Sequence, residues 1–128
     1  MSMPVMLLLL VLLFEIKHLL ADFYLQSAAM VRLKGTYGNP VGASHSLVHA
    51  AITPLILALV TPLGAGLIAA LAVAEFVIHY HTDWLKDRLT KRGGYTPAQK
   101  TYWTLVGLDQ FVHRLTYLLI LVVIVSTT

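Results

Sequence analysis

Histidine and carboxylate side chains recur four residues apart in four separate apolar segments of this chain. The pattern takes in five of the six histidines and four of the six acidic residues: His18, Asp22, His45, His49, Glu75, His79, Asp83, Asp109 and His113. Four residues make slightly more than one helical turn, so each pair projects from a single helix face. Ionisable groups are costly inside a bilayer and usually face the interior of a helical bundle. The spacing therefore predicts membrane helices with a shared polar interior.

Composition supports a membrane protein with one compact domain spanning residues 1–128. The chain is 58% hydrophobic and 12% charged, whereas a soluble domain carries about 25% charged residues. It has no cysteine, which excludes disulfides, thiolate ligands and thiol nucleophiles. The net charge of +3 comes without a basic run interleaved with aromatic residues, so nucleic acid is not an expected partner.

The hydropathy pattern predicts an all-α fold, a polytopic membrane protein built as a four-transmembrane-helix bundle. The helices are expected over residues 4–26, 44–60, 65–90 and 96–125. Each is near the roughly 20 residues that cross a bilayer. Ser44 is the expected N-cap of the second helix. The polar segment between the first two helices is expected to form a loop or a short interfacial helix.

The apolar run at the start of the chain could be taken for a signal peptide. No Lys or Arg precedes it, and Glu15, Lys17, His18 and Asp22 interrupt the later part of the segment. A retained first helix is therefore the expected state.

The positions of the four pairs along their helices place all of them at one depth in the membrane, which predicts a single site. In an up-down-up-down bundle, the end of the first helix, the start of the second, the later half of the third and the earlier half of the fourth share one side. The positive charges fall on this side too, at Arg32, Lys34, Lys86, Arg88, Lys91, Arg92 and Lys100. By the positive-inside rule, loops 27–44 and 91–98 are cytoplasmic and both termini lie outside. Trp84, Tyr102 and Trp103 are placed for an interfacial aromatic belt.

Nine imidazole and carboxylate groups exceed the four ligands of one structural zinc. They match two divalent ions bridged by a carboxylate, with the remaining groups orienting imidazoles. Zinc is the first expectation, with iron or manganese as alternatives, because the ligands are nitrogen and oxygen atoms. Glu75 is expected to bridge the ions or to act as the catalytic base.

Three further polar residues are predicted to bind substrate. Gln26 and Gln110 flank the paired residues, and Lys86 lies seven residues beyond His79 on nearly the same helix face. With Arg88, Arg114 or Lys17, Lys86 could hold an anionic group. His81 lies on nearly the opposite face from His79 and is left out of the site.

The motifs resemble those of a family of small bacterial inner-membrane proteins of unknown function. They are H-x-x-x-D-F at 18–23, H-x-x-x-H at 45–49, E-x-x-x-H-x-x-x-D at 75–83 and D-Q-x-x-H at 109–113. The likeness extends over the whole chain in length, helix number and motif order. It implies the same architecture and a location in the bacterial inner membrane.

A weaker resemblance links the paired ligands to bacterial membrane-bound metal-dependent hydrolases and, through spacing alone, to zinc-dependent phospholipase C and related nucleases. The His18–Asp22 pair has the order found there, whereas Glu75–His79 has it reversed. The leading hypothesis is a metal-dependent membrane hydrolase that acts on a lipid or other amphipathic phosphoester at the cytoplasmic interface.

Three other classes stay open at this stage. A histidine–carboxylate site in a four-helix bundle is also typical of di-iron oxidoreductases. A chain of such groups can carry or sense protons or metal ions, and an ionic cluster can be purely structural. No Gly-x-Ser-x-Gly elbow or phosphate-binding loop supports a serine hydrolase or a nucleotide enzyme. The small residues around Gly64 and Gly66 could pack against a second copy of the chain.

Overall fold

The computed structural model describes all residues 1–128 as an all-α protein without strands. Four long helices and one short helix follow one another along the chain: α1 (Met3–Phe23), α2 (Ala28–Leu33), α3 (Pro40–Val60), α4 (Ala65–Gly93) and α5 (Lys100–Thr127). The prediction of an all-α four-helix bundle is confirmed. The segment between the first two long helices is expected to form a loop or a short interfacial helix, and it contains the short helix α2.

The four long helices are each long and apolar enough to cross a bilayer, as a multi-pass membrane protein requires. Their outer surface is largely aliphatic, and residues such as Leu8, Leu59, Val73 and Val122 are more than half exposed. Polar and charged residues instead make up much of the buried interior. This distribution suits a bundle surrounded by lipid, in which ionisable groups face inward.

The second long helix begins four residues before the predicted Ser44 N-cap. Asn39 is the N-cap, and its Oδ1 accepts hydrogen bonds from the amides of Val41 and Gly42 at 3.0 and 3.1 Å. Pro40 occupies the first helical turn, where its missing N–H removes no intrahelical bond. The asparagine–proline pair is therefore a helix start and not part of the loop, and Ser44 lies inside the helix.

The connection between α4 and α5 also differs from expectation at one end. Gly94 ends α4 in the left-handed conformation (φ 61°), close to the predicted Gly-Gly stop. The last helix begins at Lys100 and not at residue 96. Residues 96–99 form a turn in which the Gln99 side chain accepts a hydrogen bond from the Thr96 amide at 2.8 Å. This local hydrogen bonding competes with an earlier helical turn.

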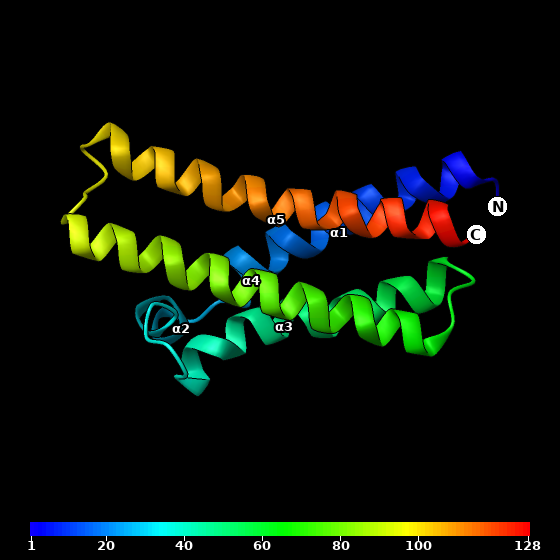
Figure 1. Ribbon diagram of the computed structural model, residues 1–128, viewed down its shortest axis with the longest axis horizontal. Helices are drawn as coiled ribbons and strands as arrows, with labels where there is room; N and C mark the ends of the chain where they lie inside the picture. The colour runs from blue at the N-terminus through cyan, green and yellow to red at the C-terminus, as the bar shows by residue number, and fades with distance from the viewer.

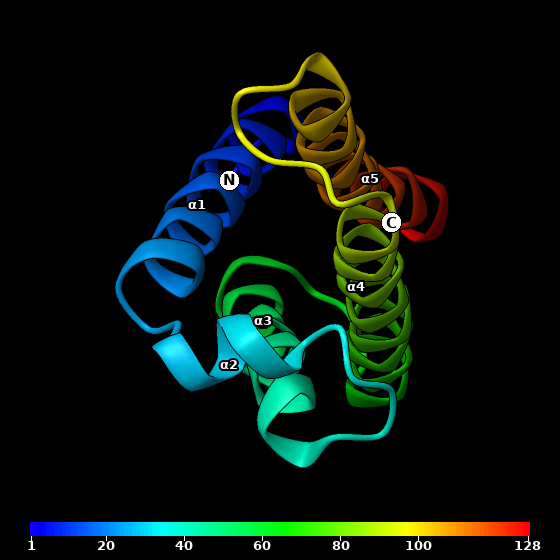
Figure 2. The ribbon, with the colours of Figure 1, turned by 90° about the vertical axis from the view of Figure 1, so that its left-hand side faces the viewer.

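The helices alternate in direction, so the two termini and the α3–α4 turn lie at one end of the molecule (Figure 1). At the other end, α2 lies against the start of α3, and α4 and α5 extend beyond it to their connection (Figures 1 and 2). The four segments that carry the paired residues therefore run side by side through the same half of the bundle, as an up-and-down topology requires.

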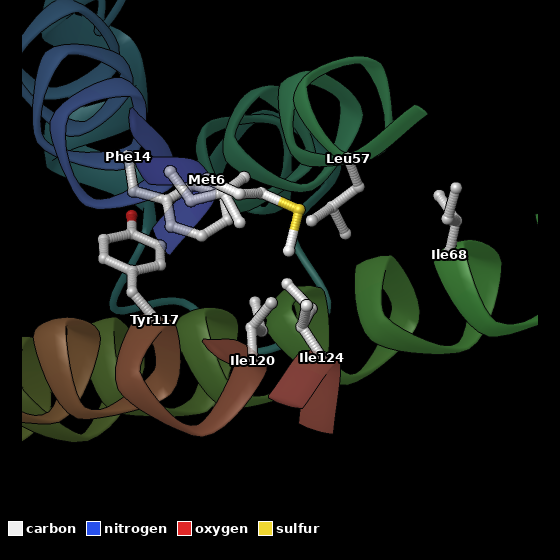
Figure 3. Close-up of a cluster of buried hydrophobic side chains, with 8 residues drawn as sticks. Met6, Phe14, Leu57, Ile68, Tyr117, Ile120 and Ile124 are labelled. Carbon is white, nitrogen blue, oxygen red and sulfur yellow. The ribbon is translucent and has the colours of Figure 1, made fainter. Parts of the chain in front are cut away.

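The half of the bundle nearer the termini is packed with apolar side chains from all four long helices (Figure 3). Phe14 of α1 stacks on Tyr117 of α5 with ring centroids 5.1 Å apart, and Leu57, Ile120 and Ile124 are almost fully buried. Dispersion contacts of this kind hold membrane helices together, because lipid is as apolar as the side chains. One half of the interior is thus apolar and the other half polar.

Gly42 of α3 packs closely against the backbone at the end of α2. A Cβ atom there would overlap the backbone carbonyl of Leu33. We expect Gly42→Ala to lower the free energy of unfolding by about 1–3 kcal/mol, measured by thermal unfolding in detergent, because backbone cannot move aside as a side chain can. Gly66→Ala is the control, since nothing lies within 4 Å of an added Cβ. Equal melting temperatures for the two variants would contradict this view of the α2–α3 contact.

Candidate metal centre

Five imidazole rings, contributed by all four long helices, converge in the polar half of the bundle. They belong to His18, His45, His49, His79 and His113, all of which are buried. Neighbouring rings have centroids 4.0–5.8 Å apart, and the closest are His79 with His113 at 4.0 Å and with His49 at 4.1 Å. The polar half of the bundle therefore holds five imidazole rings, each able to offer a nitrogen to a metal ion.

Asp22, near the end of α1, collects three of these rings around one carboxylate. Its Oδ1 lies 3.0 Å from Nε2 of His49 and 3.4 Å from Nε2 of His45. Its Oδ2 lies 3.1 Å from Nε2 of His18, one helical turn earlier. The carboxylate is half-buried and is the most solvent-accessible member of the cluster.

Asp83, on α4, forms a second centre beside the first. Its Oδ2 lies 3.4 Å from Nε2 of His45 and 3.5 Å from Nε2 of His79, while its Oδ1 lies 3.8 Å from Nε2 of His113. The ammonium group of Lys34 approaches the same carboxylate at 3.6 Å, from the segment after α2. Asp83 therefore links histidines from three different helices.

The ligand atoms form two groups that could each hold a metal ion. Asp22, His45, His49 and His79 make one group, and His79, Asp83 and His113 make the other, with the ligand atoms of each group within 4.8 Å of one another. Ligands about 2.1 Å from a tetrahedral ion stand about 3.4 Å apart, close to the observed nitrogen–oxygen separations. His79 belongs to both groups, so the two sites would be adjacent.

The cluster also concentrates buried polar atoms that lack a hydrogen-bond partner. Seven such atoms lie in the cluster or directly beside it: His49 Nδ1, Glu75 Oε2, His79 Nε2, Asp83 Oδ2, Asp109 Oδ1 and both ring nitrogens of His113. The eighth is Asp87 Oδ2, which has an ion pair with Lys91 at 2.6 Å, as Asp83 Oδ2 has with Lys34 at 3.6 Å. Buried polar atoms are nearly always satisfied in native proteins, so this concentration fits residues shaped to hold a cation.

Glu75 lies one helical turn from His79 but belongs to neither ligand group. Its Oε1 forms a buried ion pair with Lys17 of α1, whose ammonium also donates to Thr53 Oγ1 at 2.7 Å. The other carboxylate oxygen, Oε2, has no partner. Glu75, His79 and His113, together with Thr116 and Tyr117, line a narrow space that is too small for a water molecule. Lys17 thus holds the Glu75 carboxylate through Oε1 only, and Glu75 lies at the border of the histidine cluster.

Asp109 and the two predicted glutamines flank the cluster. Asp109 Oδ2 lies 4.0 Å from His113 Nδ1 and outside both ligand groups. Gln110 Oε1 lies 3.0 Å from His18 Nε2, and Gln26 donates to the Asp22 carbonyl at 3.0 Å. Of these three, only Asp109 contacts the side chain of a member of a ligand group and could orient it, in the way outer groups support metal-bound histidines.

Lys86 and His81 lie outside the cluster. Lys86 lines a groove between α4 and α5 that also contains Asp109. His81 is exposed, with its Nε2 3.0 Å from the Tyr37 hydroxyl, so the residue omitted from the predicted site is indeed away from it.

Two lysines hold positions that sequence reasoning missed. Lys34 reaches the cluster from a connecting segment and also donates to Gln26 Oε1 at 3.3 Å. Lys17 is buried against Glu75, whereas the sequence suggested only that it could help Lys86 to hold an anion. The available signal was the position of Lys17 within an apolar run, since a buried membrane cation requires a partner.

Comparison with known proteins places the chain in a family without an assigned activity. A model of the family described as "Protein of unknown function (DUF3307)" matches residues 7–128. The chain therefore belongs to this family. No curated protein and no solved structure matches it.

Proposed function

We propose that this DUF3307 protein is a membrane-embedded, metal-dependent hydrolase that acts on a lipid or other amphipathic phosphoester at the cytoplasmic interface. The observation that carries the proposal is the pair of ligand groups that share His79, within a cluster rich in unpartnered nitrogen and oxygen atoms. Two adjacent divalent ions are the usual means of stabilising both the attacking and the leaving oxygen in phosphoester cleavage.

One ion would be held by Asp22, His45 and His49, and the other by Asp83 and His113. His79 would complete one of these two sets, because a neutral imidazole binds one ion through one nitrogen. His18 and Asp109, which contact Asp22 and His113, would orient these ligands. When bound, zinc supplies a nucleophile from water at neutral pH and withdraws charge from the phosphoryl oxygen. Zinc suits the nitrogen and oxygen ligands, and iron or manganese would also be accepted.

Glu75 is the residue we assign as the proton acceptor. The ammonium of Lys17 pairs with Oε1, while Oε2 has no partner. Glu75 lies one helical turn from His79 and borders the same narrow space as His79 and His113, so it is adjacent to the second ligand group. A carboxylate within hydrogen-bond reach of a water can take its proton as the bond to phosphorus forms.

Positive charge near the cluster would attract an anionic headgroup. Lys34 lies 3.6 Å from Asp83, and Lys86 lines the neighbouring groove. Both belong to the end of the bundle with α2 and the α4–α5 connection, where the basic residues gather. We assign this end to the cytoplasmic side of a bacterial inner membrane, with Gln26 and Gln110 able to hydrogen-bond the substrate.

The test is turnover by the detergent-purified protein on phospholipid and polyprenyl-phosphate substrates, before and after chelation. Loss of hydrolysis with chelator and recovery with added zinc are expected. Bound iron with visible absorption and no hydrolysis would favour a di-iron oxidoreductase. A protein without bound metal would contradict the proposal and favour proton transport or a structural cluster.

Glu75→Gln is expected to reduce kcat by about 10²- to 10⁴-fold, because the amide cannot accept the proton. The same substitution also leaves Lys17 buried without its counter-ion and destabilises the fold, so a control is needed that separates loss of stability from loss of the base. The double variant Lys17→Met, Glu75→Gln removes both charges and is expected to be folded and equally inactive. An active double variant would show that Glu75 is not the base.

A further inference from the structure

We infer that the groove between α4 and α5 binds the acyl chain of an anionic phospholipid, whose phosphate is held at Lys86 and which reaches the metal centre sideways from the inner leaflet. The groove has a volume of about 180 Å³. Leu85 and Leu89 of α4 form part of its wall, and Leu105 and Leu108 of α5 form another part. The inference rests on the proposed function only for the chemical step, not for binding.

Comparison with the other grooves along the bundle favours this one. The groove between α3 and α4, of about 290 Å³, is lined only by apolar residues and offers nothing to a headgroup. The groove between α1 and α5 contains Glu15 and Arg114, but these form an ion pair at 2.6 Å. Lys86 in the α4–α5 groove has no ion-pair partner within 4.0 Å and remains available to an anion.

The same groove reaches the metal centre. Asp109 is both a lining residue of the groove and a neighbour of His113 in the cluster. Lys86 lines the groove together with Asp109. A lipid phosphate held at Lys86 would stand beside Asp109 and the ligand groups while its chain stayed among the leucines. This arrangement matches the chemistry of a single anionic lipid drawn from the surrounding bilayer.

Photolabelling tests the inference without requiring turnover. The whole protein is placed in phosphatidylcholine vesicles that contain phosphatidic acid, or phosphatidylcholine as the headgroup control, with a diazirine on one acyl chain. Label from phosphatidic acid is expected within residues 85–89 and 105–112. Leu108→Trp should abolish it by filling the groove, and Lys86→Gln should reduce it about fivefold. Val73→Trp, at a similarly exposed position in the α3–α4 groove, should leave it unchanged.

Equal labelling of all grooves, or equal labelling by phosphatidylcholine, would overturn the inference. Hydrolysis is measured on the same samples, so the two proposals can fail separately. Specific labelling without hydrolysis would support the lipid site and count against the hydrolase. Hydrolysis without labelling of the α4–α5 groove would support the hydrolase and overturn the proposal that this groove binds the lipid.

Discussion

His79→Ala is expected to remove at least one metal ion from the protein, because His79 belongs to both possible ligand groups and would complete one of them. The metal content of the purified protein, measured by elemental analysis, should fall from about two equivalents to about one or fewer. His113→Ala removes one of the three members of the second group and should also leave about one equivalent. Loss of metal from both variants would support two adjacent sites.

His81→Ala provides the matched control, because it removes an imidazole two residues away that is exposed and outside the cluster. It should keep the full complement of metal. Identical stoichiometry in all three variants would contradict the assignment of the ligand groups. Circular dichroism should show unchanged helicity in each, since the α-helical backbone bonds do not depend on these side chains.

Lys17→Met is expected to lower the free energy of unfolding by about 3–5 kcal/mol, because it leaves the buried Glu75 carboxylate without its counter-ion. Both side chains of this pair are almost fully buried. The double variant Lys17→Met, Glu75→Gln should recover most of the loss, since neither buried charge remains. Thermal unfolding in detergent measures the difference.

An ion pair near the polar end of α4 provides the comparison for this second result. Lys91→Met breaks the Asp87–Lys91 pair, whose side chains are 16% and 59% exposed, and should change stability by less than about 1 kcal/mol in detergent. Equal losses from Lys17→Met and Lys91→Met would show that burial does not set the strength of the inner pair. A double variant as unstable as Lys17→Met would show that packing, and not charge, is the cause.

Local signals account for most of the predicted fold. Long apolar runs set the number of helices, and glycine near residue 94 ended α4 as expected. The errors occurred where short polar side chains decide between helix and turn. Asn39 capped α3 earlier than Ser44 would have, and the Gln99 side chain bonded the turn before α5. Such choices depend on hydrogen bonds of one side chain, which hydropathy does not record.

The four-residue spacing by itself determined that imidazoles and carboxylates would share helix faces, and the alternation of helices determined that these faces would lie in one half of the bundle. Periodicity and chain direction can be read from the sequence, so these two predictions require no knowledge of how the side chains pack. Only the tertiary structure decided which groups meet. Helix rotation and tilt placed His79 in both ligand groups and turned Glu75 toward Lys17. The segment after α2 brought Lys34 to Asp83, a contact between residues far apart in the chain. These pairings follow from distances between different helices, which no spacing along one helix can encode.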